Sequence, residues 1–229
     1  MKLLAALLAI APVLIADGPG RIASIRSDSE FALSADPDTT PWRNVKGVFA
    51  ENNPLGEPTP ANRYEIRSRW TDKHLYFLFI CPYTDLYLKP NPTTTEETMK
   101  LWEWDVVEIF AGADFENIKR YREYQVSPQG EWIDLDINSG ALNADKQWLW
   151  NSGFTHRARI SPDRKIWYAE LKIPFATLDE RPPREGNEIR INFYRFSGRP
   201  PQRVSTAWQP TGKRSHHVPE AFGRLVLSK

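Results

Sequence analysis

Short segments in which apolar and polar residues alternate recur along most of this chain, and clusters of turn-forming residues separate them. In residues 63–70 (RYEIRSRW), Tyr64, Ile66 and Trp70 fall on one face and charged residues on the other. This is the pattern of a strand with one buried side. No segment of helical length and periodicity competes with these strands, so the pattern predicts an all-β protein.

Eight further segments have the features of strands, with Pro, Gly, Asn and Asp between them. They are residues 75–82, 105–112, 121–128, 131–137, 154–161, 166–173, 188–197 and 222–228. This number of strands suits two packed sheets, so we expect an antiparallel β-sandwich of the jelly-roll or immunoglobulin-like kind. Residues 50–62, 84–101 and 138–152 are expected to be loops, where binding residues tend to lie.

The first residues combine one lysine, an apolar run and then small residues around Ala16, which is the layout of a secretory signal peptide. The run is shorter than the roughly 20 residues that span a bilayer, and Pro12 interrupts it. We therefore expect a signal peptide over residues 1–16 and a secreted or periplasmic protein without membrane contact. Residues 17–229 contain no composition break or long linker, which predicts a single domain.

The charge balance and the motif content exclude several classes of function. Lys and Arg number 30 against 29 Asp and Glu, and the formal net charge of +1 offers no electrostatic footprint for nucleic acid. No P-loop, dinucleotide fingerprint or zinc-type Cys/His spacing is present. Cys81 is the only cysteine, so no intrachain disulfide can form, and its place in a predicted core strand indicates a buried thiol.

Residues 101–112 (LWEWDVVEIFAG) place Trp102, Trp104, Asp105 and Glu108 at the start and on the face of one predicted strand. A sugar ring has apolar C–H faces and a rim of hydroxyls, so a sugar site needs a flat aromatic ring and polar groups. Alternatively, one tryptophan packs in the core and the acids are solvated or paired with arginines. The residues alone favour this interpretation and the sugar site equally. The segment is therefore a candidate carbohydrate site.

Several short motifs follow one another along the chain in a fixed order. They are WEWDVVEIF, YREYQVSPQG, IWYAELKIPF, INFYR, the tryptophan of STAWQP, and the H-x-P-x-x-FG-x-L pattern of HVPEAFGRL. From about Asp36 to the C-terminus, this order resembles the carbohydrate-binding module family 9-like domains. The resemblance implies a β-sandwich, often attached to xylanases, that binds reducing ends of glucans and xylans or smaller sugars. It also implies structural calcium in some members and otherwise no cofactor.

The resemblance also implies site residues. A tryptophan before the acidic strand stacks on the sugar and the glutamate of that strand bonds the hydroxyls, which corresponds to Trp102 and Glu108 here. On the next strand the family has a Q-x-R pattern, whereas this chain has E-Y-Q, which puts Glu123 and Gln125 at the ligand. His216 stands where the type member has a second tryptophan, so the aromatic clamp is expected to be one-sided.

The positions of four other residues near these motifs can also be predicted. Arg195 and Asn192 are expected on the polar face of a strand that the family uses at its site. Trp208 is expected to be structural. His217 is expected to be solvated or structural, because neighbours on a strand point to opposite faces and therefore do not chelate one metal together with His216.

These observations predict an exported, non-catalytic protein that supports carbohydrate catabolism. Its expected partners are a polysaccharide end or small sugar of the xylan or glucan type and a separate catalytic protein. One alternative is a glycoside hydrolase acting on O-glycosyl bonds, because Asp105, Glu108, Glu123 and Asp134 offer the carboxylate pairs that hydrolysis needs. The other is a haem-binding sandwich domain with Met99 and His216 as axial ligands.

Overall fold

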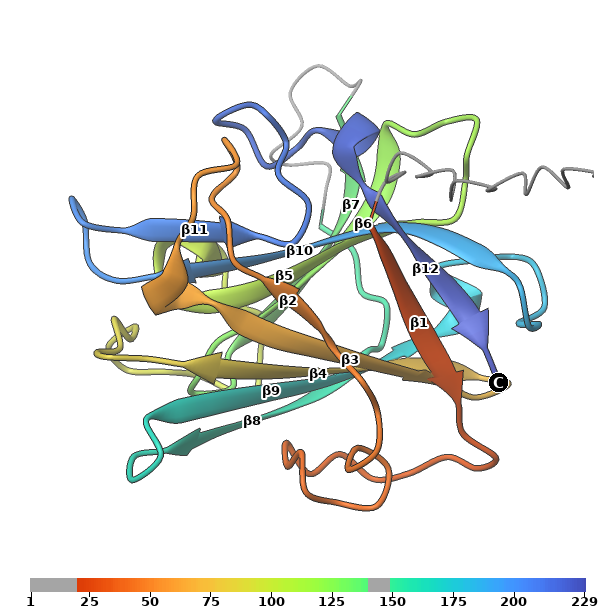
Figure 1. The fold of residues 1–229 in the computed structure, drawn as a ribbon, viewed down its shortest axis with the longest axis horizontal. Helices are drawn as coiled ribbons and strands as arrows, with labels where there is room; N and C mark the ends of the chain where they lie inside the picture. The colour runs from red at the N-terminus through yellow and green to blue at the C-terminus, as the bar shows by residue number, and fades with distance from the viewer. Residues whose placement is uncertain (1–19, 140–148) are drawn as a thin grey trace, which may run out of the picture.

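A computed structural model of the chain describes residues 20–139 and 149–229, so the predicted signal peptide over residues 1–16 lies outside the described residues. Regular structure in the described ranges consists of β-strands and short 3-10 helices (Figure 1). The strands are β1 Arg21–Arg26, β2 Val48–Ala50, β3 Tyr64–Trp70, β4 His74–Pro82, β5 Val106–Gly112, β6 Arg120–Val126, β7 Trp132–Asn138, β8 Thr155–Ser161, β9 Ile166–Pro174, β10 Glu188–Ser197, β11 Val204–Ala207 and β12 Gly223–Ser228. The 3-10 helices are η1 Pro60–Asn62, η2 Leu101–Glu103, η4 Phe175–Thr177 and η5 Pro219–Ala221.

All nine predicted strands are present, and β1, β2 and β11 are additional. Strand β1 was not predicted because its two buried positions are Ile22 and Ser24, and a serine does not contribute to an apolar pattern. In the structure the Ser68 hydroxyl donates a hydrogen bond to the Ser24 hydroxyl at 2.9 Å, which allows both polar groups to be buried. Strands β2 and β11 are too short to show a period.

Ten strands form one continuous path in the order β7-β6-β5-β10-β12-β1-β3-β4-β9-β8, with β11 paired to β10 and β2 to β3. The path curls into two facing layers, which confirms the β-sandwich (Figure 1). Every pairing is antiparallel except those of β1, which runs parallel to both β12 and β3. Strand β1 therefore joins the two halves of the sheet.

The main core lies between the layers. Phe77 and Phe79 of β4 meet Phe193 of β10 with ring centroids 5.6 and 5.9 Å apart, and Trp208 is buried against Phe193 as expected. Strands β5, β6 and β10 each place every second side chain in this core. Because side chains alternate along a strand, the residues between them point to the outer face of the layer. A second apolar cluster covers that outer face, and it includes Phe110. The candidate site described below lies on this second cluster.

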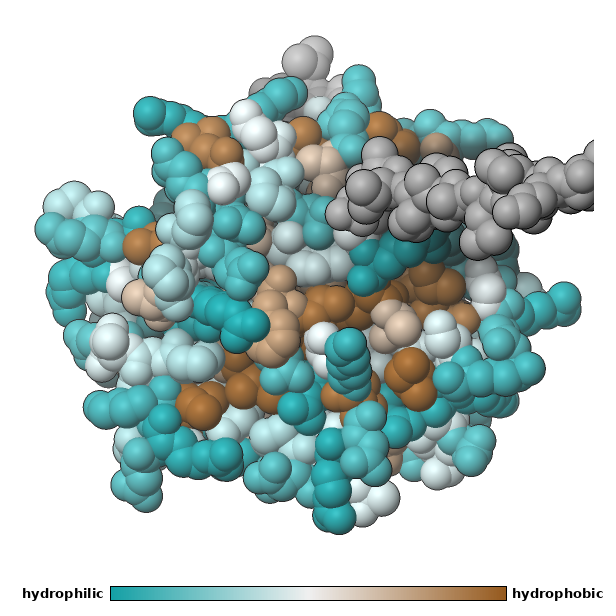
Figure 2. Space-filling model, in the orientation of Figure 1, coloured by the Kyte–Doolittle hydropathy of each residue, from teal (hydrophilic) through white to brown (hydrophobic). Residues whose placement is uncertain are grey.

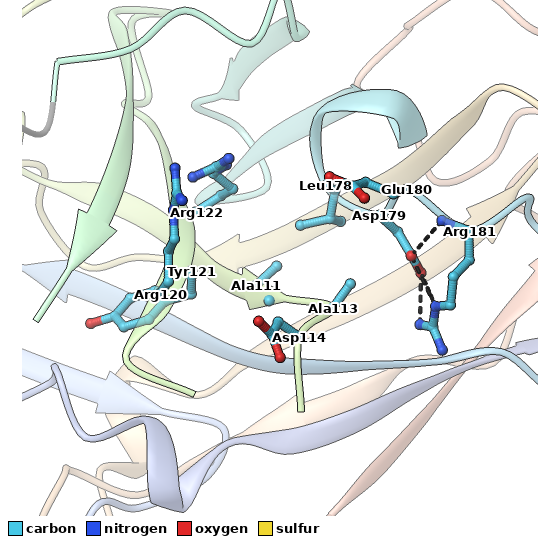
Figure 3. Close-up of a pocket in the computed structure, with 11 residues that line it drawn as sticks. Ala111, Ala113, Asp114, Arg120, Tyr121, Arg122, Leu178, Asp179, Glu180 and Arg181 are labelled. Carbon is cyan, nitrogen blue, oxygen red and sulfur yellow. Dashed lines mark hydrogen bonds and ion pairs between the residues drawn. The ribbon is translucent and has the colours of Figure 1, made fainter. Parts of the chain in front are cut away.

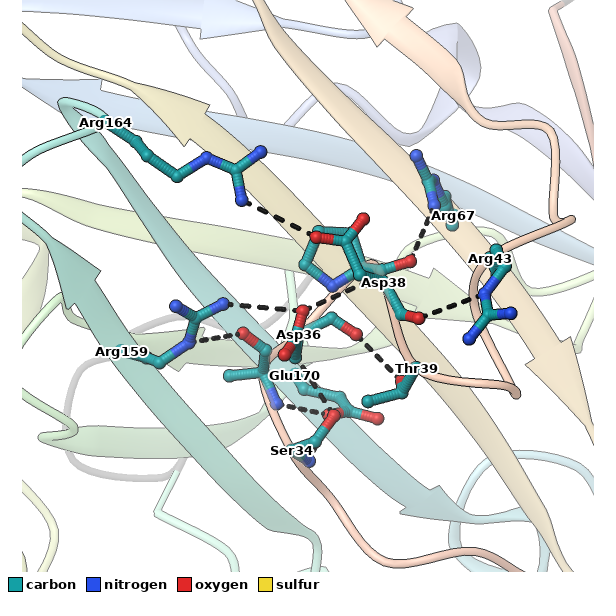
Figure 4. A network of polar contacts seen from close by, with 11 residues as sticks. Ser34, Asp36, Asp38, Thr39, Arg43, Arg67, Arg159, Arg164 and Glu170 are labelled. Atoms are coloured by element: carbon teal, nitrogen blue, oxygen red, sulfur yellow. Dashed lines mark hydrogen bonds and ion pairs between the residues drawn. The ribbon is translucent and has the colours of Figure 1, made fainter.

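The long connection between β1 and β2 is fixed to the sheet by Glu170 of β9, which is fully buried (Figure 4). Its carboxylate accepts hydrogen bonds from the backbone N–H groups of Ser34 and Ala35 at 2.6 and 2.7 Å and from the indole of Trp42 at 2.7 Å. Arg159 adds an ion pair to Asp36 and a bond to the Ala35 carbonyl. One buried carboxylate thus satisfies several donors of a segment without regular structure.

Figure 2 shows apolar residues gathered in a band across the middle of one face, over β1 and β3, with hydrophilic residues around it. Phe49 of β2 is among the exposed large apolar residues, and the Arg63 guanidinium lies 3.5 Å from its ring centroid. Within residues 20–139 and 149–229, no helix is long and apolar enough to cross a membrane.

Candidate functional site

A pocket of about 330 Å³ opens on the outer face of the layer that contains β5, β6 and β10. We call it the outer-face pocket. Four of the six residues predicted for the sugar site line it, namely Trp102, Glu108, Glu123 and His216. The other lining residues are Met99, Lys100, Phe110, Leu135, Phe196 and His217. Aromatic rings and carboxyl groups are therefore brought together in one cavity, as the sequence pattern predicted.

Two buried carboxyl groups form the acidic part of the pocket. In the register of β5 with β6, Glu108 lies opposite Gln125 and Glu123 opposite Phe110, so the two glutamates are diagonal neighbours on one face. Glu108 is 2% exposed and Glu123 is 4% exposed. Burial and the nearby Glu123 charge raise the pKa of Glu108 well above its usual range, and burial raises the pKa of Glu123 to about 7. The pair therefore retains a proton near neutral pH.

Gln125 lies beneath the pocket instead of lining it. Its side-chain amide donates a hydrogen bond to Oε1 of Glu123, which holds that carboxyl in place. Oε2 of Glu123 and Oε1 of Gln125 are buried and have no hydrogen-bond partner within the described part of the chain. Two buried acceptors are thus left unsatisfied next to the pocket, an arrangement that a ligand with donor groups would satisfy.

Trp102 forms one wall of the pocket from the short helix η2, where its ring is half-buried against the outer-face cluster. The Arg203 guanidinium donates hydrogen bonds to the carbonyls of Trp102, at 2.7 Å, and of Trp104. It also lies over the Phe196 ring, 5.4 Å from the centroid. Arg203 therefore connects the turn that carries Trp102 to the β10–β11 hairpin. Sequence reasoning missed Arg203 because its targets are backbone carbonyls, which leave no pattern in the sequence.

His216 forms another wall, at the position where the family resemblance placed a second tryptophan. Its Nε2 lies 2.6 Å from the Ser205 hydroxyl, and its ring packs against Phe196 and Tyr194 at centroid distances of 4.7 and 5.1 Å. Burial lowers the pKa of His216 to about 4, so the ring is neutral at physiological pH. Phe196 was not among the predicted site residues, and it supplies an aromatic ring beside His216.

His217 also lines the pocket, which sequence reasoning did not predict. Its ring stacks on Phe110 with centroids 5.0 Å apart, and its Nδ1 lies 2.7 Å from the Tyr121 hydroxyl. Both histidines reach the same cavity because they lie in the segment before η5 and not in a strand, so the alternation rule does not apply to them.

The structure does not bring Arg195 to the pocket. It is 1% exposed, lies on the opposite face of β10 from Tyr194 and Phe196, and donates to the Asn62 carbonyl at 3.5 Å. The expectation that Asn192 and Arg195 share a polar face is wrong, because residues three positions apart in a strand point to opposite faces. Asn192 donates to the Tyr194 hydroxyl at 2.8 Å.

The remaining acids of the hydrolase alternative lie elsewhere. Asp105 accepts hydrogen bonds from the N–H groups of Gly198 and Tyr87, and Asp134 accepts one from the N–H of Ser152. Across residues 20–139 and 149–229, no group of three or more His, Cys, Asp or Glu side chains is placed to hold a metal ion.

A second cavity of about 440 Å³ lies at one end of the sandwich, beside β5 and β6 (Figure 3). Most of its charged side chains are already paired with protein groups: Asp179 is bound by Arg181 through both carboxylate oxygens, and Arg120 and Arg122 both pair with Asp136. Such a cleft offers a ligand few unsatisfied groups. The outer-face pocket, with aromatic walls and unsatisfied acceptors, is the stronger candidate.

A family model described as carbohydrate family 9 binding domain-like matches residues 38–229. A protein of Arthroderma benhamiae described as an extracellular protein is 23% identical over 200 residues, which cover 82% of this chain and 87% of the relative.

A family 9 carbohydrate binding module from Caldicellulosiruptor kristjanssonii has been solved with cellotriose and with glucose. The two structures match this one with TM-scores of 0.64 and 0.65 at 17% identity, over 91% of this chain and 94% and 96% of theirs. At this identity the structural match shows that the fold is shared.

Proposed function

This chain belongs to the carbohydrate family 9 binding domain-like family, and from that premise we propose that it binds a saccharide in the outer-face pocket without transforming it. The observation that carries the proposal is the presence of Trp102, Glu108, Glu123 and His216 in one cavity. An aromatic wall suits the apolar face of a sugar ring, and the carboxyl groups suit its hydroxyls.

The finer features of the function belong to the same proposal. A single domain over residues 17–229 is exported after removal of a signal peptide over residues 1–16. It holds the end of a glucan or xylan chain, or a small sugar, and supports carbohydrate catabolism beside a separate catalytic protein. The cellotriose and glucose complexes of the Caldicellulosiruptor module support a glucan or small-sugar ligand, and the extracellular relative supports export.

Replacing Trp102 with alanine tests the site. Loss of one stacking ring should weaken binding by about 1 to 3 kcal/mol, which is about a quarter to three quarters of a millimolar sugar affinity of about 4 kcal/mol. Titration calorimetry with cello- and xylo-oligosaccharides measures this. Trp104→Ala is the matched control, because Trp104 lies two residues away, packs on Tyr87 and does not line the pocket. Unchanged affinity in a folded Trp102→Ala protein would place the site elsewhere.

Hydrolysis is a second candidate, favoured by the two carboxyl groups in one pocket and by the proton that they retain near neutral pH. Release of reducing sugar from xylan or aryl glycosides, lost in Glu108→Gln, would establish it. The haem alternative has both of its candidate ligands, Met99 and His216, in the lining of the same pocket. A Soret band in the purified protein would establish that function instead.

A further inference from the structure

We infer that the outer-face pocket selects a saccharide that carries a free, positively charged amino group. The inference rests on the proposed function and narrows it, since it names the chemical class of sugar that the site prefers. It follows from the charge, the donor and acceptor content and the aromatic lining of the pocket.

The pocket contains two buried carboxyl groups, and neither forms an ion pair with a basic side chain of the described residues, although the charge of Arg203 acts on Glu108 from a distance. Lys100 is the cationic residue in its lining, yet the Lys100 side chain is 68% exposed and pairs with Glu103 at 3.8 Å. Arg203 lies behind the Trp102 wall, where backbone carbonyls accept from its Nη1 and Nη2 atoms. Buried carboxylates are costly unless a cation pairs with them. An ammonium group of the ligand would supply the cation that Glu108 and Glu123 lack.

Once both carboxyl groups are ionised, the hydrogen-bonding groups of the pocket are mainly acceptors. Oε2 of Glu123 is unpartnered in the described structure, and the Oε1 atom of Gln125 lies unpartnered behind it. One nitrogen of each histidine is hydrogen-bonded to a protein hydroxyl: Nε2 of His216 to Ser205, and Nδ1 of His217 to Tyr121. An ammonium group has three donors and no acceptor, whereas a hydroxyl brings one donor and two lone pairs. The pocket therefore matches an ammonium group better than a hydroxyl.

The aromatic lining adds to the same preference. Trp102, Phe110 and Phe196 line the cavity together with the two carboxyl groups. The face of an aromatic ring attracts a cation, and the attraction is larger where water is excluded. His216 is neutral at physiological pH, so it adds a ring without adding a repelling charge. Carboxylates and aromatic rings around one cavity are the groups that recognise ammonium ligands.

Binding of such a ligand should release the proton that the carboxyl pair retains. An ammonium group stabilises the ionised forms of both Glu108 and Glu123, and the free protein holds a proton on the pair near neutral pH. The other titratable or charged groups around the pair are Tyr121, Tyr194, Lys100, Arg203, His216 and His217. The two tyrosines stay neutral and the two histidines are already deprotonated at pH 7, so the released proton comes from the glutamates.

Three trisaccharides with the same β-1,4 backbone test the inference: cellotriose, its fully deacetylated amino counterpart chitotriose, and N-acetylated chitotriose. They carry a hydroxyl, an ammonium and an acetamide at the same ring position. The ammonium form should bind at least about 10-fold more tightly than cellotriose at pH 7 and low salt, as charge-assisted bonds replace neutral ones. The N-acetylated form should lose this advantage. Calorimetry in two buffers of different ionisation enthalpy should detect more proton release, or less proton uptake, when the ammonium form binds the wild type than when it binds Glu123→Gln, because protonation of the sugar amine contributes equally to both.

Glu123→Gln should lower the ratio of the chitotriose affinity to the cellotriose affinity toward one, because one of the two charges that select the amine is gone. Glu180→Gln is the matched control: it removes one carboxylate from the other cavity and should leave the ratio unchanged. Glu108→Gln gives a second test of the pair, and a melting curve establishes that each variant is folded.

Equal affinity of the wild-type protein for cellotriose and chitotriose would overturn this inference and leave the proposed function intact. A preference for the amine that survives in both Glu123→Gln and Glu108→Gln would overturn it as well, because the amine would then bind elsewhere. Failure of all three trisaccharides, and of xylo-oligosaccharides, to bind would overturn the proposed function itself.

Discussion

Replacing Glu123 with glutamine should stabilise the protein at neutral and alkaline pH and have little effect in acid. The folded protein raises the pKa of Glu123 from 4.5 to about 7 because the side chain is buried. Below pH 4.5 the carboxyl is protonated in both the folded and the unfolded states. As the pH rises from 4.5 to 7, the unfolded chain ionises first, so the free energy of unfolding falls, and above pH 7 the full loss remains.

The size of the effect follows from the two pKa values. The difference between 4.5 and about 7 corresponds to about 3 kcal/mol at pH 8, at about 1.4 kcal/mol for each pKa unit. In a protein of this length that raises the Tm of Glu123→Gln by about 6 to 12 °C. The substituted amide keeps an oxygen that accepts the bond from Gln125, so the local packing is preserved.

Thermal unfolding followed by circular dichroism from pH 4 to 8.5 measures the difference. The two proteins should melt together near pH 4 and separate progressively as the pH rises to about 7. Glu180→Gln, at an exposed carboxylate, should melt like the wild type throughout. A Glu123→Gln variant that is less stable at pH 8, or whose advantage does not depend on pH, would refute the reasoning.

Three further predictions concern the fold. Glu170→Ala leaves Trp42 and two backbone N–H groups without their acceptor, and should lower the free energy of unfolding in urea by at least about 3 kcal/mol; a loss below about 1 kcal/mol would contradict this. Gly223→Ala places a methyl group against the buried ring of Trp208 and should cost about 1 to 3 kcal/mol, so an unchanged Tm would be evidence against the packing described. Burial raises the pKa of the Cys81 thiol to about 12, so thiol reagents at pH 8 should label it only after unfolding, and rapid labelling of the folded protein would show that it is accessible.

The strands could be predicted because alternation is a local property of the sequence. Most of the predicted strands bury every second residue on at least one face, as Tyr64 and Ile66 do in β3, whereas the residues of the edge strand β8 are half-buried or exposed. Strands β2 and β11 could not be predicted, since three or four residues show no period and their pairing depends on neighbours distant in the chain.

The grouping of the site residues in one pocket could be predicted where the family motifs agree with the alternation of side chains along the strands. Trp102, Glu108 and Glu123 meet in one pocket because β5 and β6 are adjacent and their register sets the glutamates on one face. Arg195 was misplaced because its charge indicated exposure, whereas its position in β10 directs it toward the space between the layers. The role of Arg203 could not be predicted, since it depends on where two carbonyls lie in space.

The parallel pairing of β1 with β12 affects how the chain can fold during its synthesis. Arg21 lies beside Arg224 and Ile25 beside Ser228, so the strand that joins the two halves of the sheet takes its partner from the other end of the sequence. Pairings between such distant segments form slowly because a long loop must close first. A ribosome releases the chain from its N-terminal end, so β12 is made after the other strands of the sheet. The joint between the two layers therefore forms only after β12 has been made, and until then the newly made chain is an open substrate for chaperones.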